Sequence, residues 1–364
     1  MDSRIAAKIR QVTPYTPGEQ PHEENIVKLN TNENPYPPSK KVCEAIKELT
    51  GNTERLRLYP DPDSAPLKEA LVEHFNRINN GVKYDTKNFF VGVGSDDVLG
   101  TAFHTFFNCE EPVLFPDITY SFYEVWCDLF EITTMQKPLD KDMRLVKAHY
   151  TDKTEYGGIV IANPNAPTGL SEPLSFIKEV CKAHPECVVI VDEAYVDFGG
   201  ESAAGLIEEL PNLLVVQTFS KSRSLAGLRI GYAIGNKELI KAMEDVRYSY
   251  NSYTMNLPAQ LLGSAVLSDE DYFKETVGKI VNERERSKER LASRGFHFPD
   301  SKTNFIFAEH ESVSGEKIFT ELKKRGIYVR HFSGENIKNF NRITIGTPAQ
   351  MDRLFSALDE ILKE

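Results

Sequence analysis

Four short motifs place reactive residues directly after short apolar runs, where buried strands are expected to end. They are the segments 91–97 (VGVGSDD), 163–169 (NPNAPTG), 192–195 (DEAY) and 218–221 (TFSK). In open α/β sheets, ligands bind at the edge that the carboxyl ends of the strands form. The spacing therefore predicts that the side chains of these motifs gather at one site.

Each motif suggests its own chemistry. In the first motif, two glycines let the backbone approach a ligand closely, and the amides that open the following helix attract phosphate. A carboxylate at the end of an apolar strand, such as Asp192, needs a cationic partner. A lysine at a strand end, such as Lys221, can act as a nucleophile or a base. A dinucleotide fingerprint would require glycine at the position of Asp97, which disfavours a nicotinamide-dependent dehydrogenase.

Taken singly, each motif also fits a structural interpretation as a tight turn, a rigid loop, a capping acid or an exposed lysine. Together they offer a phosphate cradle, a buried acid and a lysine, with Asn163 nearby and Arg229 eight residues after the lysine. Pyridoxal 5'-phosphate (PLP) requires a lysine for its aldehyde, an acid for its ring nitrogen, donors for its phenolic oxygen and an anion site for its phosphate. The combination predicts a PLP site.

The composition excludes several other classes of protein. The chain has 364 residues, a formal charge of −11 and a hydrophobic fraction of 40%. An acidic chain without a basic block argues against nucleic-acid binding, and no run reaches the roughly 18 apolar residues of a membrane helix. The five cysteines form no CxxC pair and the eight histidines show no ligand spacing. We therefore expect free thiols in the reducing cytoplasm and no metal site.

The hydrophobic pattern divides the chain into three parts. The proline-rich residues 1–38 predict an arm that lies on a surface, residues 39–265 a large domain and residues 266–364 a smaller α+β domain. In the large domain, apolar runs alternate with amphipathic helical segments, which predicts an α/β fold with a mainly parallel sheet. The predicted strands of this sheet are 89–93, 113–115, 158–162, 188–191, 213–217 and 229–234. Those of the small domain are 304–307, 327–330 and 342–345.

The motifs resemble those of the fold-type-I PLP-dependent aminotransferases, and among these the histidinol-phosphate aminotransferase family. The similarity is strongest in NPNAPTG (163–169), DEAY (192–195) and FSKSRSLAGLRIGY (219–232). It extends to PYTPG (14–18), LNTNENPYPPS (29–39), YPDP (59–62), IYVRHF (327–332) and RITIG (342–346). The resemblance thus covers nearly the whole chain. It implies a seven-stranded sheet in the large domain, PLP as the cofactor and a homodimer.

The resemblance also implies roles at the cofactor ring. Lys221 is expected to form a Schiff base with the aldehyde of PLP, and Asp192 to pair with the ring nitrogen. Asn163 and Tyr195 are expected to donate to the phenolic oxygen, and Tyr120 to stack on the ring. The family often has a second asparagine where this chain has Ala166, and a glutamate where it has Asp97.

A second set of implied roles concerns the cofactor phosphate. Tyr59 is expected to reach the phosphate of the neighbouring subunit's cofactor, so that each site is built by two chains. The residues expected at the phosphate of the same chain's cofactor are Ser95 and Asp96, through their backbone amides, Thr218, Ser220 and Arg229.

The activity that the resemblance implies is a ping-pong transamination between L-histidinol phosphate and 2-oxoglutarate, which yields imidazole acetol phosphate and L-glutamate in histidine biosynthesis. Arg330 and Arg342 are the candidate anion binders, because a guanidinium fits phosphate and carboxylate alike. One pocket, completed by Tyr15 and Asn163, could serve both substrates. Two alternatives stay open: an aromatic amino-acid aminotransferase, and a PLP-dependent decarboxylase of a phosphorylated amino acid.

Overall fold

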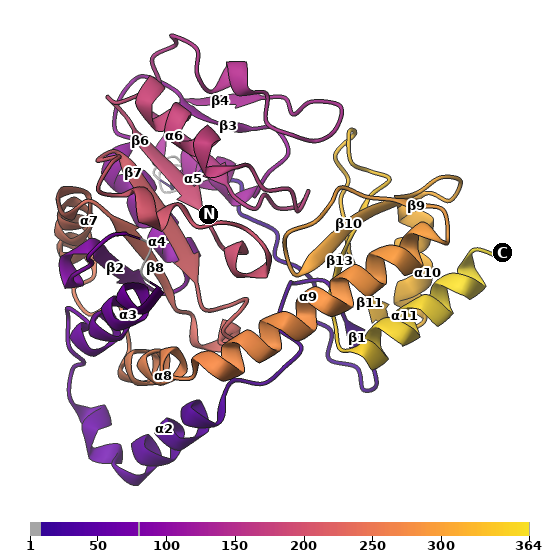
Figure 1. Cartoon of the computed structure of the whole chain (residues 1–364), viewed down its shortest axis with the longest axis horizontal. Coiled ribbons are helices and arrows are strands. Elements are labelled where there is room, and N and C mark those ends of the chain that lie inside the picture. Colours follow the sequence, from indigo (N-terminus) through magenta and orange to yellow (C-terminus); the bar gives the residue numbers. More distant parts are fainter. Residues whose placement is uncertain (1–8, 79–80, 364) are drawn as a thin grey trace.

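The computed structural model describes residues 9–78 and 81–363. Its main sheet consists of β2 (Phe89–Gly92), β3 (Val113–Pro116), β4 (Thr134–Lys137), β5 (Gly158–Ala162), β6 (Val188–Asp192), β7 (Leu213–Thr218) and β8 (Gly231–Gly235). The strand order is β2-β8-β7-β6-β5-β3-β4 (Figure 1). All neighbours are parallel except at β8, which runs antiparallel to β2 and β7. The predicted α/β fold with a mainly parallel seven-stranded sheet is confirmed.

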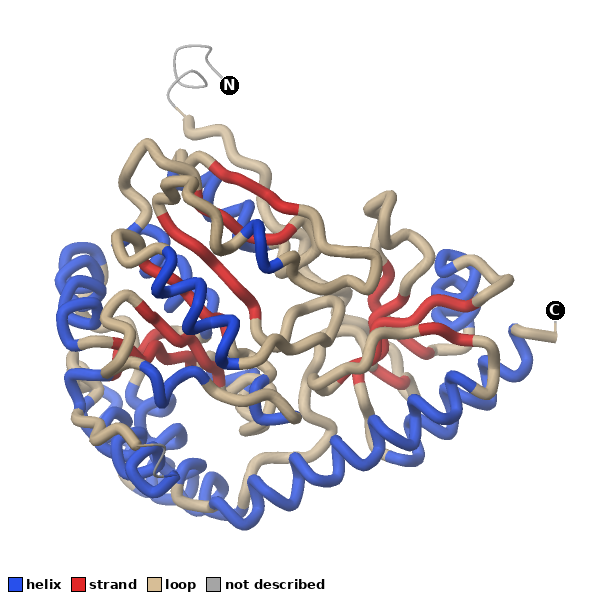
Figure 2. The backbone as a smooth tube through the Cα atoms, turned by 45° about the horizontal axis from the view of Figure 1, so that its top comes forward, coloured by secondary structure: helices blue, strands red, loops and turns tan. Residues whose placement is uncertain are grey.

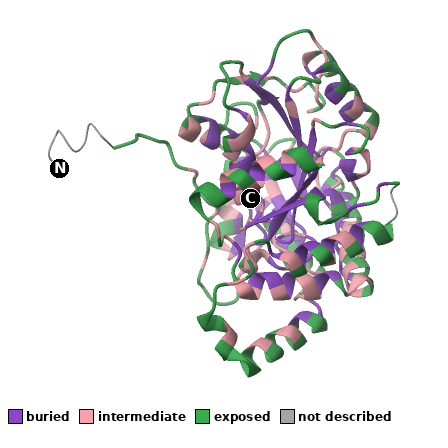
Figure 3. Ribbon diagram, turned by 90° about the vertical axis from the view of Figure 1, so that its left-hand side faces the viewer, coloured by how far each residue is buried: buried purple, intermediate pink, exposed green. Residues whose placement is uncertain are grey.

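Helices cover both faces of this sheet. They are α2 (Lys40–Gly51), α3 (Ala65–Ile78), α4 (Ser95–Phe106), α5 (Phe122–Phe130), α6 (Leu174–Ala183), α7 (Lys237–Tyr250) and α8 (Leu257–Leu267). One face packs against α2, α3, α6 and α8, and the other against α4, α5 and α7. Strand side chains alternate between them, so Val191 faces the first group and Ile190 the second. Burial on both faces explains the continuous apolar runs (Figure 3).

Two features of the main sheet differ from the prediction. The edge strand β4 was not predicted, because its sequence TMQK has no apolar run and its residues are exposed or half-buried. The strand predicted from Arg229 begins only at Gly231, since Arg229 has a φ of 54° and therefore cannot continue an extended strand.

The last third of the chain forms a second, smaller group of strands (Figure 2). Its sheet is antiparallel and consists of β9 (Phe296–His297), β10 (Phe305–His310), β12 (Arg330–His331) and β13 (Asn341–Thr344). The predicted strand 327–330 is split: β11 (Ile327–Tyr328) pairs instead with β1 (Val27–Lys28) of the N-terminal arm. The helices of this region are α9 (Glu270–Ala292), α10 (Gly315–Lys324) and α11 (Pro348–Ile361).

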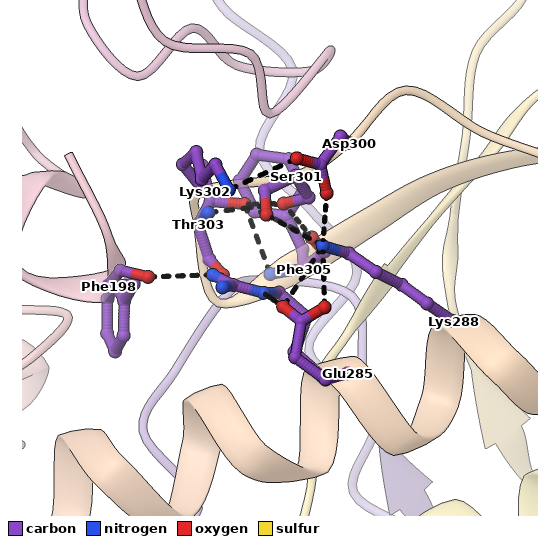
Figure 4. A network of polar contacts seen from close by, with 9 residues as sticks. Phe198, Glu285, Lys288, Asp300, Ser301, Lys302, Thr303 and Phe305 are labelled. Atoms are coloured by element: carbon purple, nitrogen blue, oxygen red, sulfur yellow. Dashed lines mark hydrogen bonds and ion pairs between the residues drawn. The ribbon is translucent and has the colours of Figure 1, made fainter.

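A polar network on α9 ties the two groups of strands together (Figure 4). Nη1 of Arg284 donates to the backbone carbonyl of Phe198, after β6, at 2.7 Å and to that of Thr303, before β10, at 2.8 Å. The backbone amide of Lys302 donates to the carbonyl of Gly169 at 2.7 Å. The last of these bonds holds the NPNAPTG loop, which ends at Gly169, against the segment that precedes β10.

We propose the division into an arm, a large and a small domain with the predicted boundaries. The boundary between residues 265 and 266 lies inside α8, close to the start of α9. In the described part of the chain, no helix combines the length and the apolar character that a membrane crossing needs.

Candidate active site

Two adjoining cavities lie beyond the carboxyl ends of β5, β6 and β7, where the motifs predicted a site. The inner cavity has a volume of about 110 Å³ and the outer one of about 150 Å³. Both are lined by Tyr120, Ala166, Tyr195 and Lys221. The predicted residues that line only the inner cavity are Ser95, Asp96, Asp192 and Arg229. Those that line only the outer cavity are Tyr15, Arg330 and Arg342.

The inner cavity ends at the N-terminus of α4. Gly94 precedes this helix with a φ of 84°, a backbone conformation that favours glycine. A Cβ on Gly231 would lie 2.3 Å from the backbone nitrogen of Ser95, so β8 approaches the helix start only because it carries no side chain there. The free amides and the helix dipole make this end of the cavity suitable for an anion.

Side chains extend the anion-binding end. Nη1 of Arg229 donates to Oγ of Ser220 at 3.3 Å, and Oγ1 of Thr218 donates to the same oxygen at 3.0 Å. Nη2 of Arg229 forms an ion pair with Asp96 at 3.2 Å. The hydroxyl of Tyr120 donates to the other oxygen of the Asp96 carboxylate at 2.9 Å. The structure therefore gathers these five predicted residues around the start of α4.

Asp192 is the buried acid of the inner cavity. Its Oδ2 accepts a hydrogen bond from the hydroxyl of Tyr123 at 2.7 Å, and its Oδ1 accepts one from the backbone amide of Ala194 at 3.2 Å. Removal from water raises the pKa of its carboxyl from 3.8 to about 6, against the lowering effect of these bonds. A buried carboxylate whose hydrogen-bond partners are neutral would be stabilised in its charged form by a cationic ligand.

Lys221 lies at the junction of the two cavities. Its Nζ donates to the backbone carbonyl of Thr31 at 3.2 Å and lies 5.7 Å from the ring centroid of Tyr195. The hydroxyl of Tyr195 accepts a hydrogen bond from Nδ2 of Asn32 at 2.8 Å. Both contacts come from the N-terminal arm, which therefore forms one wall of the site.

Asn163 is not among the described residues that line either cavity. Its Oδ1 accepts hydrogen bonds from Oγ of Ser171 at 3.0 Å and from the amide of Glu172 at 2.8 Å, and its Nδ2 donates to the carbonyl of Glu172 at 3.0 Å. The structure therefore does not bring this predicted amide to the cavities: Asn163 holds its own loop, and Ala166 from the same loop lines both cavities.

The outer cavity is basic. Arg330 and Arg342 are register partners on β12 and β13, and both line it. Nη2 of Arg342 donates to the carbonyl of Asn30 at 3.2 Å, and burial lowers the pKa of this guanidinium. No aspartate or glutamate occurs among the described lining residues. Like charges directly opposite each other on neighbouring strands repel, so an anionic ligand between the two guanidinium groups would reduce their repulsion.

Two aromatic residues complete the predicted set. Tyr15 lines the outer cavity, and its ring stacks on Phe122 with centroids 4.7 Å apart. Tyr59 lies elsewhere: its side chain is 81% exposed and stacks on Tyr253 with centroids 4.5 Å apart. The structure thus does not bring Tyr59 to the cavities of its own chain.

Sequence reasoning missed several residues of the site, among them Tyr123 and three residues of the arm. Tyr123 has the spacing of an ordinary core residue of α5. The available signal was its position three residues after Tyr120, which places the two side chains near each other. The arm residues Asn30, Thr31 and Asn32 belong to the motif LNTNENPYPPS, whose asparagines in a proline-rich segment were the available signal.

Comparisons with known proteins agree with this geometry. The sequence profile of the family described as aminotransferase class I and II matches residues 24–358. The chain is 45% identical over 364 residues, all of both chains, to the histidinol-phosphate aminotransferase of Brachyspira hyodysenteriae. It is 47% identical over 355 residues, 98% of each chain, to that of Chromohalobacter salexigens.

A solved structure extends the likeness to three dimensions. The fold matches that of histidinol-phosphate aminotransferase from Sinorhizobium meliloti in complex with pyridoxal-5'-phosphate, with a TM-score of 0.81 and 27% identity. The match covers 93% of this chain and 91% of that one. Together with the site at the strand ends, these likenesses place the chain in the aminotransferase class I and II family and, within it, among the histidinol-phosphate aminotransferases.

Proposed function

We propose that the chain is a PLP-dependent aminotransferase that converts L-histidinol phosphate and 2-oxoglutarate into imidazole acetol phosphate and L-glutamate in histidine biosynthesis. One observation carries the proposal, namely that Lys221 lies between two cavities. The inner cavity contains a buried acid and an anion-binding helix start, and the outer cavity contains two arginines. The names of relatives that are 45% to 47% identical over nearly the whole chain support the choice of substrate.

The inner cavity fits PLP in the chemistry of its donors. The carboxylate of Asp192 has hydrogen-bond partners that are neutral, and burial raises its pKa, so a cation beside it would stabilise its charged form. The protonated ring nitrogen of PLP is such a cation. The start of α4, Arg229 and Ser220 form a cluster that can take the phosphate, with Thr218 holding Ser220 in place.

When bound, PLP supplies an aldehyde that takes up amines and a ring that accepts an electron pair. We assign the covalent attachment to Lys221, whose Nζ, when not attached, would move the proton at the substrate carbon that bears nitrogen. Asp192 would hold a proton on the ring nitrogen by its charge. Tyr195 would donate to the phenolic oxygen, and Tyr120 would lie against the ring.

The outer cavity is proposed to bind the acidic groups of both substrates. Arg342 and Arg330 present two guanidinium groups to a space without acidic lining, and Tyr15 adds a hydroxyl. A phosphate from one substrate and a carboxylate from the other can use the same pair, since guanidinium forks accept either group. The NPNAPTG loop, braced by Asn163, closes the cavity through Ala166.

We further propose a homodimer in which Tyr59 serves the neighbouring site. The support is its position: an aromatic side chain that is 81% exposed and backed by Tyr253 is ready to be covered by a second chain. A cytoplasmic location belongs to the proposal as well. Its support is that all five cysteines are free thiols.

An amine-donor panel with 2-oxoglutarate as acceptor tests the proposed function. Glutamate formation should be fastest with L-histidinol phosphate. Faster turnover of phenylalanine would identify an aromatic amino-acid aminotransferase instead. Release of carbon dioxide from a phosphorylated amino acid, without any need for the oxo acid, would identify a decarboxylase and overturn the proposal.

A further inference from the structure

Asn32 lies at the centre of a buried hydrogen-bond chain that links the small sheet to the active site. The residue is 1% exposed and has a φ of 58°. Its Nδ2 donates to the hydroxyl of Tyr195 at 2.8 Å, and its Oδ1 accepts from Oγ1 of Thr344 at 2.9 Å. Its backbone carbonyl accepts from Nδ2 of Asn304 at 2.9 Å.

Thr344 fixes which way the amide of Asn32 points. The backbone amide of Asn32 donates to Oγ1 of Thr344 at 3.1 Å, so this oxygen is already an acceptor. The hydroxyl proton of Thr344 is then free to be donated, and it goes to Oδ1 of Asn32. This arrangement uses the hydroxyl proton of Thr344 and turns the amide nitrogen of Asn32 towards Tyr195, where it can only donate.

This orientation decides what the Tyr195 hydroxyl can do. Because its oxygen accepts from Asn32, its own proton is left for another acceptor. Among the described residues no other hydrogen bond to this hydroxyl is formed, and Tyr195 lines both cavities. The proton is thus available to a ligand in the cavity.

Few other groups can take over this task. Asn163, the residue expected from the sequence to donate beside Tyr195, uses its amide on Ser171 and Glu172. Ala166, which lines both cavities, has no polar side chain. The hydroxyl of Tyr120 already donates to Asp96. The ring oxygen of a bound cofactor therefore depends heavily on Tyr195.

We propose that Asn32 is a positioning residue that aims the hydroxyl proton of Tyr195 at the phenolic oxygen of PLP. The inference rests on the proposed function, because it requires PLP in the inner cavity. It adds that a residue of the N-terminal arm, oriented by Thr344 of the small sheet, sets the electronic state of the cofactor without touching it.

The expected consequence is spectroscopic. In a PLP–lysine imine, the phenolic oxygen is shared between the imine proton and any outside donor. When the imine nitrogen loses its proton, the phenolic oxygen no longer has the hydrogen bond from that nitrogen. A hydrogen-bond donor from the protein then stabilises the oxygen and so favours the deprotonated imine. Loss of the Tyr195 donor should therefore raise the pKa of the imine, by about one unit for one hydrogen bond to a charged oxygen.

Asn32→Asp is the sharpest test. Aspartate has nearly the same shape and tolerates the same left-handed backbone conformation. Its carboxylate accepts where the amide of Asn32 donated, so it draws the Tyr195 proton away from the cofactor. The imine pKa, measured by absorbance during a pH titration of the PLP-loaded protein, should rise by about one unit or more.

Two further variants separate positioning from mere anchoring of the arm. Thr344→Val removes the group that orients the amide of Asn32 and should shift the imine pKa in the same direction. It serves as the second test if Asn32→Asp does not fold. Asn304→Ala also loosens the arm, because it removes a bond to the Asn32 backbone, but it leaves the partners of the Asn32 side chain in place and should leave the imine pKa unchanged.

A double-mutant cycle with Tyr195→Phe decides whether the effect passes through the hydroxyl. Once the hydroxyl is gone, Asn32→Asp should produce no further shift. A wild-type imine pKa in Asn32→Asp, or an undiminished shift in the Tyr195→Phe background, would overturn the inference while leaving the proposed function intact. A wild-type protein that takes up no PLP would instead overturn the proposed function, and the inference with it.

Discussion

The buried acid Asp192 makes a quantitative prediction about the protein without its cofactor. Burial raises the pKa of this carboxyl from 3.8 to about 6, so the folded chain holds the proton more tightly than the unfolded chain does. Stability from this group is therefore fully present below about pH 4 and is lost as the pH rises through about 6. Asparagine does not ionise, so the Asp192→Asn variant should not lose unfolding free energy at this position as the pH rises.

The size of the effect follows from the two pKa values. The difference between 3.8 and about 6 corresponds to about 3 kcal/mol of unfolding free energy once the carboxyl is ionised in both states. About half of this difference develops between about pH 5 and about pH 8. In Asp192→Asn, Oδ1 can still accept from the amide of Ala194, but Nδ2 can only donate to the hydroxyl oxygen of Tyr123, so this hydrogen bond reverses its direction. The cost of that reversal does not change with pH in this range, so the growth of the stability difference with pH still reports on Asp192.

The assay is urea unfolding of the PLP-free protein and of PLP-free Asp192→Asn across this pH range. The advantage of the variant should grow towards high pH by the amount given above. An advantage that stays constant with pH, or that shrinks, would show that Asp192 is not held in its neutral form by burial.

The same substitution should act in the opposite sense on the enzyme with its cofactor. Removing the charge that faces the ring nitrogen should reduce transamination by roughly a hundredfold or more, the usual cost of removing one partner from a buried charge pair. Glu193→Gln is the matched control. Glu193 contacts Ser202 and Gln217 on the other face of the sheet, so this variant should keep its activity.

Three further predictions concern the proposed roles. Lys221→Ala should abolish transamination but leave the circular dichroism spectrum unchanged, and borohydride reduction with peptide mapping of the parent should place the cofactor on Lys221; label on another lysine would contradict the assignment. Tyr59→Phe should lose PLP faster during dialysis, whereas Tyr253→Phe should not; equal retention in both variants would argue against a site shared between subunits. Arg342→Ala should raise the KM for histidinol phosphate and for 2-oxoglutarate by at least about tenfold each, since a charge-assisted hydrogen bond contributes about 1.5–3 kcal/mol; an effect on one substrate alone would contradict the shared pocket.

The main sheet and the motifs at its strand ends were predictable because their signals are local. A strand buried on both faces, such as β5 or β7, reads as a short apolar run, and the residues that follow it reach the ligand-binding edge. The edge strand β4 lacks this signal, since its TMQK sequence has one apolar residue, Met135, and the strand is defined by its pairing with β3. Pairing with a segment far away in the chain cannot be predicted from the local pattern of apolar and polar residues.

The position of Asn163 shows a second limit. The motif NPNAPTG offers two asparagines, and its sequence does not state which side chains face the cavity. The structure turns Asn163 towards Glu172, while Nδ2 of Asn165 donates to the carbonyl of Ile118 at 3.0 Å. Both amides hold the loop, so a polar residue within a functional motif is not automatically a ligand-contacting one.

The arm joins parts of the site that no single domain contains. Successive residues of the arm contact three different groups: the carbonyl of Asn30 accepts from Arg342, that of Thr31 from Lys221, and Asn32 donates to Tyr195. The same segment is paired through β1 with β11 beside the small sheet. Arg342, Lys221 and Tyr195 are thus held by one short stretch of backbone. A displacement of the small sheet that carried the arm with it would therefore move the hydrogen-bond partners of Lys221, Tyr195 and Arg342 at the same time.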